Sequence, residues 1–287
     1  MNFLKKQRNL FAACFFLMSL GLFILQMGYL FLPNLVGREV EYIHNQLFYL
    51  INIACILSLA ISFLLYFQQT RKWLLIGGSV FTLFIVVNTY LIYTTSQEVN
   101  NIVSLSPDGK HTLVLKQDKE QGDIIYYREY YTILARPLQR ISASEHELQV
   151  EWLANDVAAV TYQDHNQNIQ QHIATYGDRG DGISYYYVSS EIYGEWQDGE
   201  TRVISGPEGI SVEDNGERQT FAWENIQQHG TLAIVLSDDE HNAAWTIALA
   251  ENFEISSNAT VEQPGDIRVY KATLGDADVN TLERFGN

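Results

Sequence analysis

Residues 10–32 read LFAACFFLMSLGLFILQMGYLFL, residues 47–67 read LFYLINIACILSLAISFLLYF, and residues 73–93 read WLLIGGSVFTLFIVVNTYLIY. None of these three stretches contains a charged residue. About 20 apolar residues in a helix cross the ~30 Å hydrocarbon core of a bilayer. Soluble proteins rarely bury such segments in succession. The sequence therefore predicts a membrane protein with a three-helix transmembrane domain in residues 1–94.

The first stretch follows a basic segment, Lys5, Lys6 and Arg8, as the apolar part of a signal peptide does. It is much longer than the roughly 7–15 apolar residues of a signal peptide. It also ends without a small-residue cleavage site. We therefore expect an uncleaved anchor.

The distribution of basic residues predicts the orientation, because cytoplasmic loops carry an excess of Lys and Arg. Besides the basic start, Arg71 and Lys72 lie between the second and third stretches, whereas the connection between the first and second has more acidic than basic residues. We expect a multi-pass protein of the cell membrane with a cytoplasmic N-terminus. Residues 95–287 would then be extracytoplasmic.

Small residues mark one face of the second predicted helix. Ala54, Ser58 and Ser62 recur at four-residue spacing, and small residues let membrane helices approach closely. We expect this face to pack against the protein's own helices; a helix of another membrane protein is the alternative. The absence of charged residues from the three stretches argues against a transporter or a proton relay.

The two parts of the chain differ in charge. Residues 1–94 contain six basic and two acidic residues, a net charge of +4, whereas residues 95–287 contain 12 basic and 32 acidic residues, a net charge of −20. Nucleic acid binding is excluded for such a domain, because phosphate contacts need clustered cations. The expected partners are the lipid bilayer and either another membrane protein or a ligand of the cell envelope.

Both cysteines, Cys14 and Cys55, lie in the apolar stretches, so the predicted exterior domain has no disulfide. Secreted eukaryotic domains of this size commonly use disulfides. The composition therefore favours a bacterial protein, with a Gram-positive cell envelope as its setting.

After an expected tether at 95–101, the chain has the pattern of β-structure. The run Ser106-Pro107-Asp108-Gly109-Lys110 predicts a tight turn between two short β-rich segments, because Pro fixes φ and Gly accepts a positive φ. This run resembles the blade-entry turn of TolB-like β-propellers. The resemblance covers residues 102–176, about one blade, and the Ser-Pro-Asp-Gly string does not recur, as it would in a full propeller. Further strands of this blade-like subdomain, 102–182, are expected at 123–135, 148–153, 156–162 and 169–176.

Residues 183–287 are β-rich by a different pattern and are expected to form a second subdomain. The expected strands are 183–189, 201–205, 209–213, 218–223, 231–236, 243–249 and 266–274. The sequence thus predicts an antiparallel all-β exterior domain, sandwich-like or a partial propeller.

No catalytic or cofactor-binding motif occurs in the chain. Two acidic turns are candidates for holding Ca²⁺, one with Asp178 and Asp181, the other with Asp238 and Asp239. Solvated hairpin tips explain the same residues more simply. We therefore expect no cofactor.

Aromatic residues are concentrated in two short segments and supply the candidate ligand-binding residues. These are Tyr127, Tyr131, Tyr185, Tyr187, Tyr193 and Trp196. An exposed Tyr/Trp face beside acidic residues suits stacking on sugars or binding of a peptide. The alternative is that tyrosine simply favours half-buried strands.

These observations leave two functions open. The first is a membrane-anchored, non-enzymatic protein that binds or senses a ligand, or serves as an accessory subunit. The alternative is a membrane-anchored hydrolase of envelope material that uses scattered carboxylates such as Asp178, Asp181 and Glu191. The hydrolase requires two carboxylates that converge in a cleft.

Overall fold

The computed structural model describes residues 2–37, 39–67, 70–144, 147–180, 185–255 and 265–285. The chain divides into two compact units, each with a hydrophobic core of its own. The first unit comprises residues 1–103, 114–120 and 124–140, and the second comprises residues 104–113, 121–123 and 141–287.

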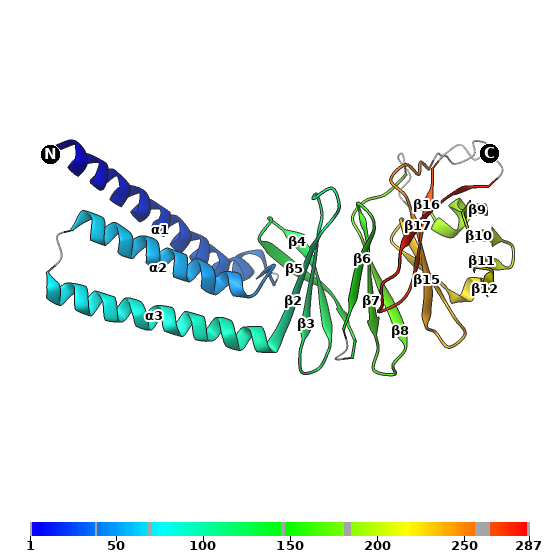
Figure 1. Ribbon diagram of the computed structural model, residues 1–287, viewed down its shortest axis with the longest axis horizontal. Coiled ribbons are helices and arrows are strands. Elements are labelled where there is room, and N and C mark those ends of the chain that lie inside the picture. Colours follow the sequence, from blue (N-terminus) through cyan, green and yellow to red (C-terminus); the bar gives the residue numbers. More distant parts are fainter. Residues whose placement is uncertain are drawn as a thin grey trace. The chain divides into compact units, whose positions relative to one another are not determined.

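Three N-terminal helices are long and apolar enough to span a membrane (Figure 1). They are α1 at Asn2–Val36, α2 at Gln46–Tyr66 and α3 at Arg71–Glu98. Many of their large apolar side chains are exposed, which is unusual for helices of a soluble protein. The expectation of three long apolar helices is confirmed.

The small-residue face of α2 packs against α1. The Ser62 hydroxyl donates a hydrogen bond to the main-chain carbonyl of Ala12 on α1, at 2.8 Å. Ser58, one turn earlier, is also buried and donates to the Ala54 carbonyl of its own helix. The face that Ser58 and Ser62 share is thus occupied by a helix of the same chain.

A five-stranded sheet completes the first unit, and its strand order is β1-β5-β4-β3-β2. The strands are β1 at Glu41–Tyr42, β2 at Val99–Leu105, β3 at Thr112–Asp118, β4 at Ile124–Tyr130 and β5 at Leu134–Ile141. Because α3 ends at Glu98 and β2 begins at the next residue, the segment expected as a tether belongs to a helix and a strand instead.

The segment 123–135, expected as one long strand, is a hairpin. Its turn contains Tyr131 and Thr132, which have φ values of 55° and 56°. Positive φ at consecutive residues reverses a chain as the primed hairpin turns do. The sequence lacks the Asn-Gly or Asp-Gly pair that is typical of such a turn. The alternating pattern of residues 123–135 therefore predicted one continuous strand in place of the hairpin.

The second unit contains two sheets. A three-stranded sheet, in the order β6-β7-β8, consists of β6 at Gln149–Ala154, β7 at Val157–Gln163 and β8 at Ile169–Thr175. A nine-stranded, barrel-like sheet has the order β12-β11-β10-β9-β17-β16-β15-β14-β13. Its strands are β9 at Gly194–Asp198, β10 at Thr201–Gly206, β11 at Gly209–Asp214, β12 at Glu217–Phe221, β13 at Ile226–His229, β14 at Ala233–Ser237, β15 at Ala243–Leu249, β16 at Ile267–Lys271 and β17 at Val279–Arg284.

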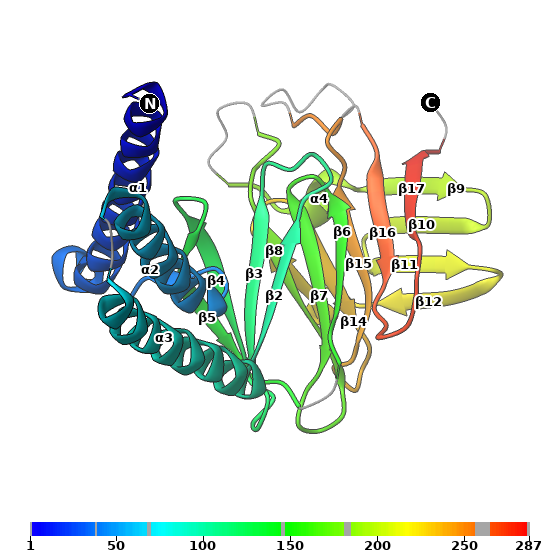
Figure 2. The ribbon, with the colours of Figure 1, turned by 60° about the vertical axis from the view of Figure 1, so that its left-hand side comes forward.

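The nine-stranded sheet curls around one core. Figure 2 shows β9–β12 running across the direction of β14–β16. Trp196 of β9, Val212 of β11 and Ile247 of β15 are fully or almost fully buried in the same cluster. Pairing of β17 with β9 joins the two parts of the sheet. The expectation of a large antiparallel all-β region is thus confirmed.

The outer face of β14–β16 packs on the three-stranded sheet. Along β14, Ile234 faces the core of the barrel-like sheet, whereas Val235 belongs to a second cluster with Val157 of β7 and Ile173 of β8. Strands β6–β8 therefore share a core with later strands, and the observed division of the chain differs from the boundary expected at 182/183. The strands covered by the propeller resemblance belong to two different sheets, and the resemblance itself stays a prediction.

Most of the expected strands of the second unit are present within a few residues of their expected limits. In the segment 183–189, residues 183 and 184 lie outside the described residues, and a short helix, α4, spans Val188–Glu191. Strands β9, β13 and β17 were not expected from the sequence.

Candidate functional site

A cavity of about 680 Å³ lies in the second unit, at the edge strand β6 of the three-stranded sheet. The β6–β7 turn, the segment that follows β15, strand β16 and the β16–β17 connection contribute to it. Its lining residues are Pro107, Gln149, Glu151, Trp152, Leu153, Ala154, Asn155, Glu251, Arg268, Asp276, Ala277, Asp278 and Val279. Four of these are acidic and one is basic.

Two of the charged side chains are engaged with the cavity wall. The Glu251 carboxylate accepts a hydrogen bond from the main-chain N–H of Asn155 at 2.8 Å, and its other oxygen lies 3.6 Å from Nη2 of Arg268. Arg268 also donates to the hydroxyl of Thr281 on β17. These contacts fix the positions of Glu251 and Arg268 and partly neutralise each charge.

Glu151 differs from the other charged groups of the cavity. It faces its cross-strand partner Ala159, which is part of the core, so the carboxylate lies on the inward face of an edge strand. Partial burial raises the pKa of this carboxyl. Within the described part of the chain, the Glu151 carboxylate has no hydrogen-bond or ion-pair partner. A cation bound here would compensate its loss of hydration.

Trp152 follows Glu151 on β6 and also lines the cavity, but successive side chains of a strand point to opposite faces, so its ring lies on the other face of β6 from the Glu151 carboxylate. Its indole N–H donates to the Ser104 hydroxyl at 2.9 Å, and its ring lies 5.8 Å from that of Tyr176. Tyr176 in turn stacks on His111 at 4.9 Å. The Trp152 ring is thus held in place and partly exposed in the cavity, and a fixed indole face attracts cations.

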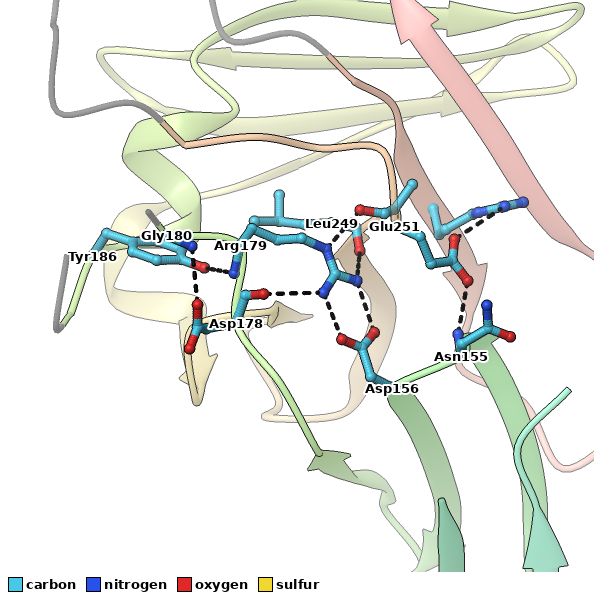
Figure 3. A network of polar contacts seen from close by, with 10 residues as sticks. Asn155, Asp156, Asp178, Arg179, Gly180, Tyr186, Leu249 and Glu251 are labelled. Atoms are coloured by element: carbon cyan, nitrogen blue, oxygen red, sulfur yellow. Dashed lines mark hydrogen bonds and ion pairs between the residues drawn. The ribbon is translucent and has the colours of Figure 1, made fainter. Parts of the chain in front are cut away.

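A buried ion pair supports the wall of the cavity (Figure 3). The Arg179 guanidinium binds both carboxylate oxygens of Asp156 in the β6–β7 connection, at 2.5 and 2.7 Å. The same guanidinium donates to the carbonyls of Leu249 and Ala250 at the end of β15. The main-chain N–H of Arg179 donates to the Tyr186 hydroxyl at 2.7 Å. These bonds hold the segments that carry Asn155 and Glu251 side by side.

The predicted aromatic residues do not form one face. Trp196 is 0 % exposed and Tyr127 is 3 % exposed, so neither presents its ring to solvent. Tyr185 and Tyr187 are exposed and contact each other edge to face, with ring centroids 5.4 Å apart. Tyr193 is also exposed, after α4, and Tyr131 lies at the β4–β5 turn of the first unit.

In the acidic turns proposed for Ca²⁺, the described carboxylates accept hydrogen bonds from within the protein. Asp238 accepts hydrogen bonds from the main-chain N–H groups of Glu240 and Asn242, and Asp178 accepts one from Gly180. Asp239 accepts a bond from the Asn225 amide. Asp181 lies outside the described residues. No group of three or more His, Cys, Asp or Glu side chains that could hold a metal ion occurs within the described ranges.

The carboxylates proposed for a hydrolase lie on separate segments. Asp178 belongs to the connection after β8, and Glu191 lies on α4, where burial raises the pKa of its carboxyl. In the part of the chain that the structure describes, no hydrogen bond joins the two. Neither residue lines the cavity.

The cavity residues were missed because they come from strands and turns far apart in the sequence. One local signal was available. Glu151 interrupts the apolar pattern of a strand whose neighbours, Val150, Trp152 and Leu153, are all apolar. Comparison of the chain with protein-family models, with curated proteins and with solved structures finds no match.

Proposed function

We propose that this protein is a membrane-anchored binding protein that recognises a cationic ligand in the cavity beside Glu151. The ligand class is an organic amine or a guanidinium, either free or on a peptide side chain. The function is one of binding or sensing and requires no catalysis. The observation that carries the proposal is the partly buried Glu151 carboxylate, which has no hydrogen bond or ion pair among the described residues and lines the same cavity as Trp152.

The membrane part of the proposal rests on the three apolar helices. The basic residues near the start of α1 and at the start of α3 favour a cytoplasmic N-terminus, with residues 95–287 outside the cell. The absence of cysteine from this part of the chain supports a bacterial envelope, of the Gram-positive kind, as the setting.

The charge of the cavity supports a cationic ligand. Glu151, Glu251, Asp276 and Asp278 face a single basic residue, Arg268. The surrounding chain adds long-range attraction, because acidic residues greatly outnumber basic ones after residue 94. Such a field raises the rate at which cations arrive, while the carboxylate and indole at the cavity decide which cation stays.

Titration of the full-length protein with spermidine, a small polyamine, tests the proposal by calorimetry. Spermidine is expected to bind at one site. Glu151→Gln keeps the size of the side chain and removes its charge, and we expect it to weaken binding about tenfold, which corresponds to about 1.4 kcal/mol. Trp152→Leu removes the indole from the cavity lining together with its hydrogen bond to Ser104, and we expect it to weaken binding by a smaller factor than Glu151→Gln, because a cation–π contact contributes less than a charge.

Glu217→Gln is the matched control. Glu217 is exposed on β12 and does not line the cavity, so this variant changes the net charge by the same amount and should bind spermidine as the unaltered protein does. Equal weakening by both variants would show non-specific attraction to an acidic surface. If spermidine does not bind, the proposal is wrong. Glu151 is then an inward-facing charge that prevents the edge strand β6 from pairing with a strand of another chain.

A further inference from the structure

The β4–β5 turn lies directly beside the connection between α1 and α2. Residues Glu41 and Tyr42 of β1 pair with Ala135 and Leu134 of β5. One residue further on, the Ile43 N–H donates to the Ile133 carbonyl at 3.0 Å, immediately after the turn. The uncharged run of α2 begins at Leu47, four residues after Ile43. The Leu47 N–H donates to the His44 carbonyl at 3.0 Å, and the first and fourth residues of such a turn lie within about 7 Å of each other, so the β4–β5 turn lies close to the level at which α2 becomes apolar.

Buried contacts hold the sheet in this position. The Glu41 carboxylate binds the Lys116 ammonium of β3 at 2.5 Å and accepts a hydrogen bond from the Tyr127 hydroxyl of β4 at 3.1 Å. On the other side of β1, the Tyr42 hydroxyl donates to the Gln26 side chain of α1 at 3.0 Å. A strand between two helices is therefore bonded both to the sheet and to α1, and the turn is fixed relative to the helix ends.

The turn exposes an aromatic side chain in a strained conformation. Tyr131 is 72 % exposed and has a φ of 55°, a region that bulky residues rarely adopt. Its ring lies 4.3 Å from that of Tyr130, and the Arg136 guanidinium covers the Tyr130 ring at 3.6 Å. Exposure and backbone strain both act against Tyr at this position in a soluble turn, so folding stability alone does not explain it.

We propose that the turn formed by Tyr130 and Tyr131 inserts into the headgroup region of the lipid bilayer. This inference rests on the proposed membrane insertion of α1–α3. Tyrosine has an apolar ring and a polar hydroxyl, and such residues concentrate at the interface between lipid and water. Arg136 adds a cation that suits lipid phosphate groups.

The charge of the neighbouring chain fits contact with anionic lipid. Residues 95–140, which include β2–β5, contain six basic and six acidic residues, whereas residues 141–287 contain six basic and 26 acidic residues. The sheet that carries the turn therefore has no net negative charge. It is not repelled by anionic headgroups, unlike residues 141–287.

A nitroxide label reports whether the turn contacts lipid. The full-length protein with Cys14→Ser and Cys55→Ser receives a single cysteine by Tyr131→Cys and is reconstituted into phosphatidylcholine–phosphatidylglycerol vesicles. In the paramagnetic resonance spectrum, we expect the label to relax more in the presence of oxygen, which concentrates in lipid, than with a water-soluble nickel chelate. A label at Tyr187→Cys, an exposed tyrosine of the second unit, should show the opposite preference. Thr132→Cys gives an independent label on the same turn if Tyr131→Cys folds poorly.

A second measurement distinguishes failure of the lipid contact from failure of the membrane anchor. Extraction of the vesicles with alkaline carbonate shows whether the protein is integral. If the protein stays in the membrane and the turn label prefers nickel as strongly as the label at 187, the lipid contact is refuted and the membrane anchor stands. If carbonate releases the protein, both are refuted.

Discussion

At the scale of single residues, the ion pair between Arg179 and Asp156 gives a sharp prediction about stability. The two side chains are only 8 % and 14 % exposed, and Asp156 accepts two bonds from one guanidinium. Asp156→Ala leaves a buried charge with main-chain carbonyls as its remaining partners. We expect a loss of about 3 kcal/mol in the free energy of unfolding of the second unit, measured by urea denaturation followed by tryptophan fluorescence.

Two further variants complete this test. Combining Asp156→Ala with Arg179→Met removes the unpaired charge and should recover part of the loss. Lys110→Met breaks the ion pair between Lys110 and Asp108, in which the Lys110 side chain is 77 % exposed. This change should lower the free energy of unfolding by less than about 1 kcal/mol. If Asp156→Ala is as mild as Lys110→Met, the buried pair contributes no more than a surface pair.

The exposure of single residues also shows how much of the candidate site could be predicted from the sequence alone. The aromatic segment around α4 was visible in the sequence, but Trp196 is buried beneath the barrel-like sheet while Tyr193, three residues earlier, is exposed. Local pattern does not determine which aromatic ring faces solvent, because that depends on packing against β15 and β16. Glu151 acquires its significance in the same way, from Glu251 and Arg268, which are remote in the chain.

At the scale of elements, two histidines make the stability of the second unit depend on pH. His172 lies on β8 and His229 ends β13. Burial lowers the pKa of His172 to about 4, and burial together with the neighbouring His172 lowers the pKa of His229 to about 4. In the unfolded chain both titrate near ~6.5, so the unfolded state binds more protons between these values. Stability is therefore complete above about pH 6.5 and falls as the pH decreases toward 4.

Unfolding curves recorded at several pH values check this dependence. Each histidine contributes a slope of at most about 1.4 kcal/mol per pH unit, and His172→Gln or His229→Gln should each reduce the slope. A free energy of unfolding that is constant from pH 7 to about pH 4 would contradict the assignment.

Elements with a regular pattern were predictable, and irregular connections were not. The three helices follow from uninterrupted apolar runs, and the β2–β3 turn follows from Pro107, Asp108 and Gly109. The β4–β5 hairpin was missed because Tyr131 and Thr132 adopt positive φ without a Gly or Asn. The direct passage from α3 to β2 was missed because the polar residues between them resemble a linker, although Lys119 donates to both the Glu98 and Ser96 carbonyls there.

At the scale of the whole molecule, the barrel-like sheet depends on pairing between strands that are remote in the sequence. Strand β17 pairs with β9 through Glu283 and Gln197, and β6–β8 bury their apolar face against β14–β16. Alternation along one strand predicts that it is half-buried but not which strand lies beside it. The all-β class was therefore predictable, whereas the assignment of strands to sheets was not.

The orientation of the chain is the prediction that concerns the molecule as a whole. Basic residues lie near the start of α1 and at the start of α3, so the positive-inside rule favours a cytoplasmic location for these helix ends and export of residues 95–287. In the variant without native cysteines, Tyr187→Cys should react with a membrane-impermeant maleimide on intact bacteria. Thr70→Cys, between α2 and α3, should react only after the cells are permeabilised. The reverse pattern would show the opposite orientation, and labelling of both positions on intact cells would refute a cytoplasmic connection between α2 and α3. If Thr70→Cys is protected and Tyr187→Cys reacts, the cavity beside Glu151 belongs to the compartment outside the membrane, where it can meet only ligands that the cell surface encounters.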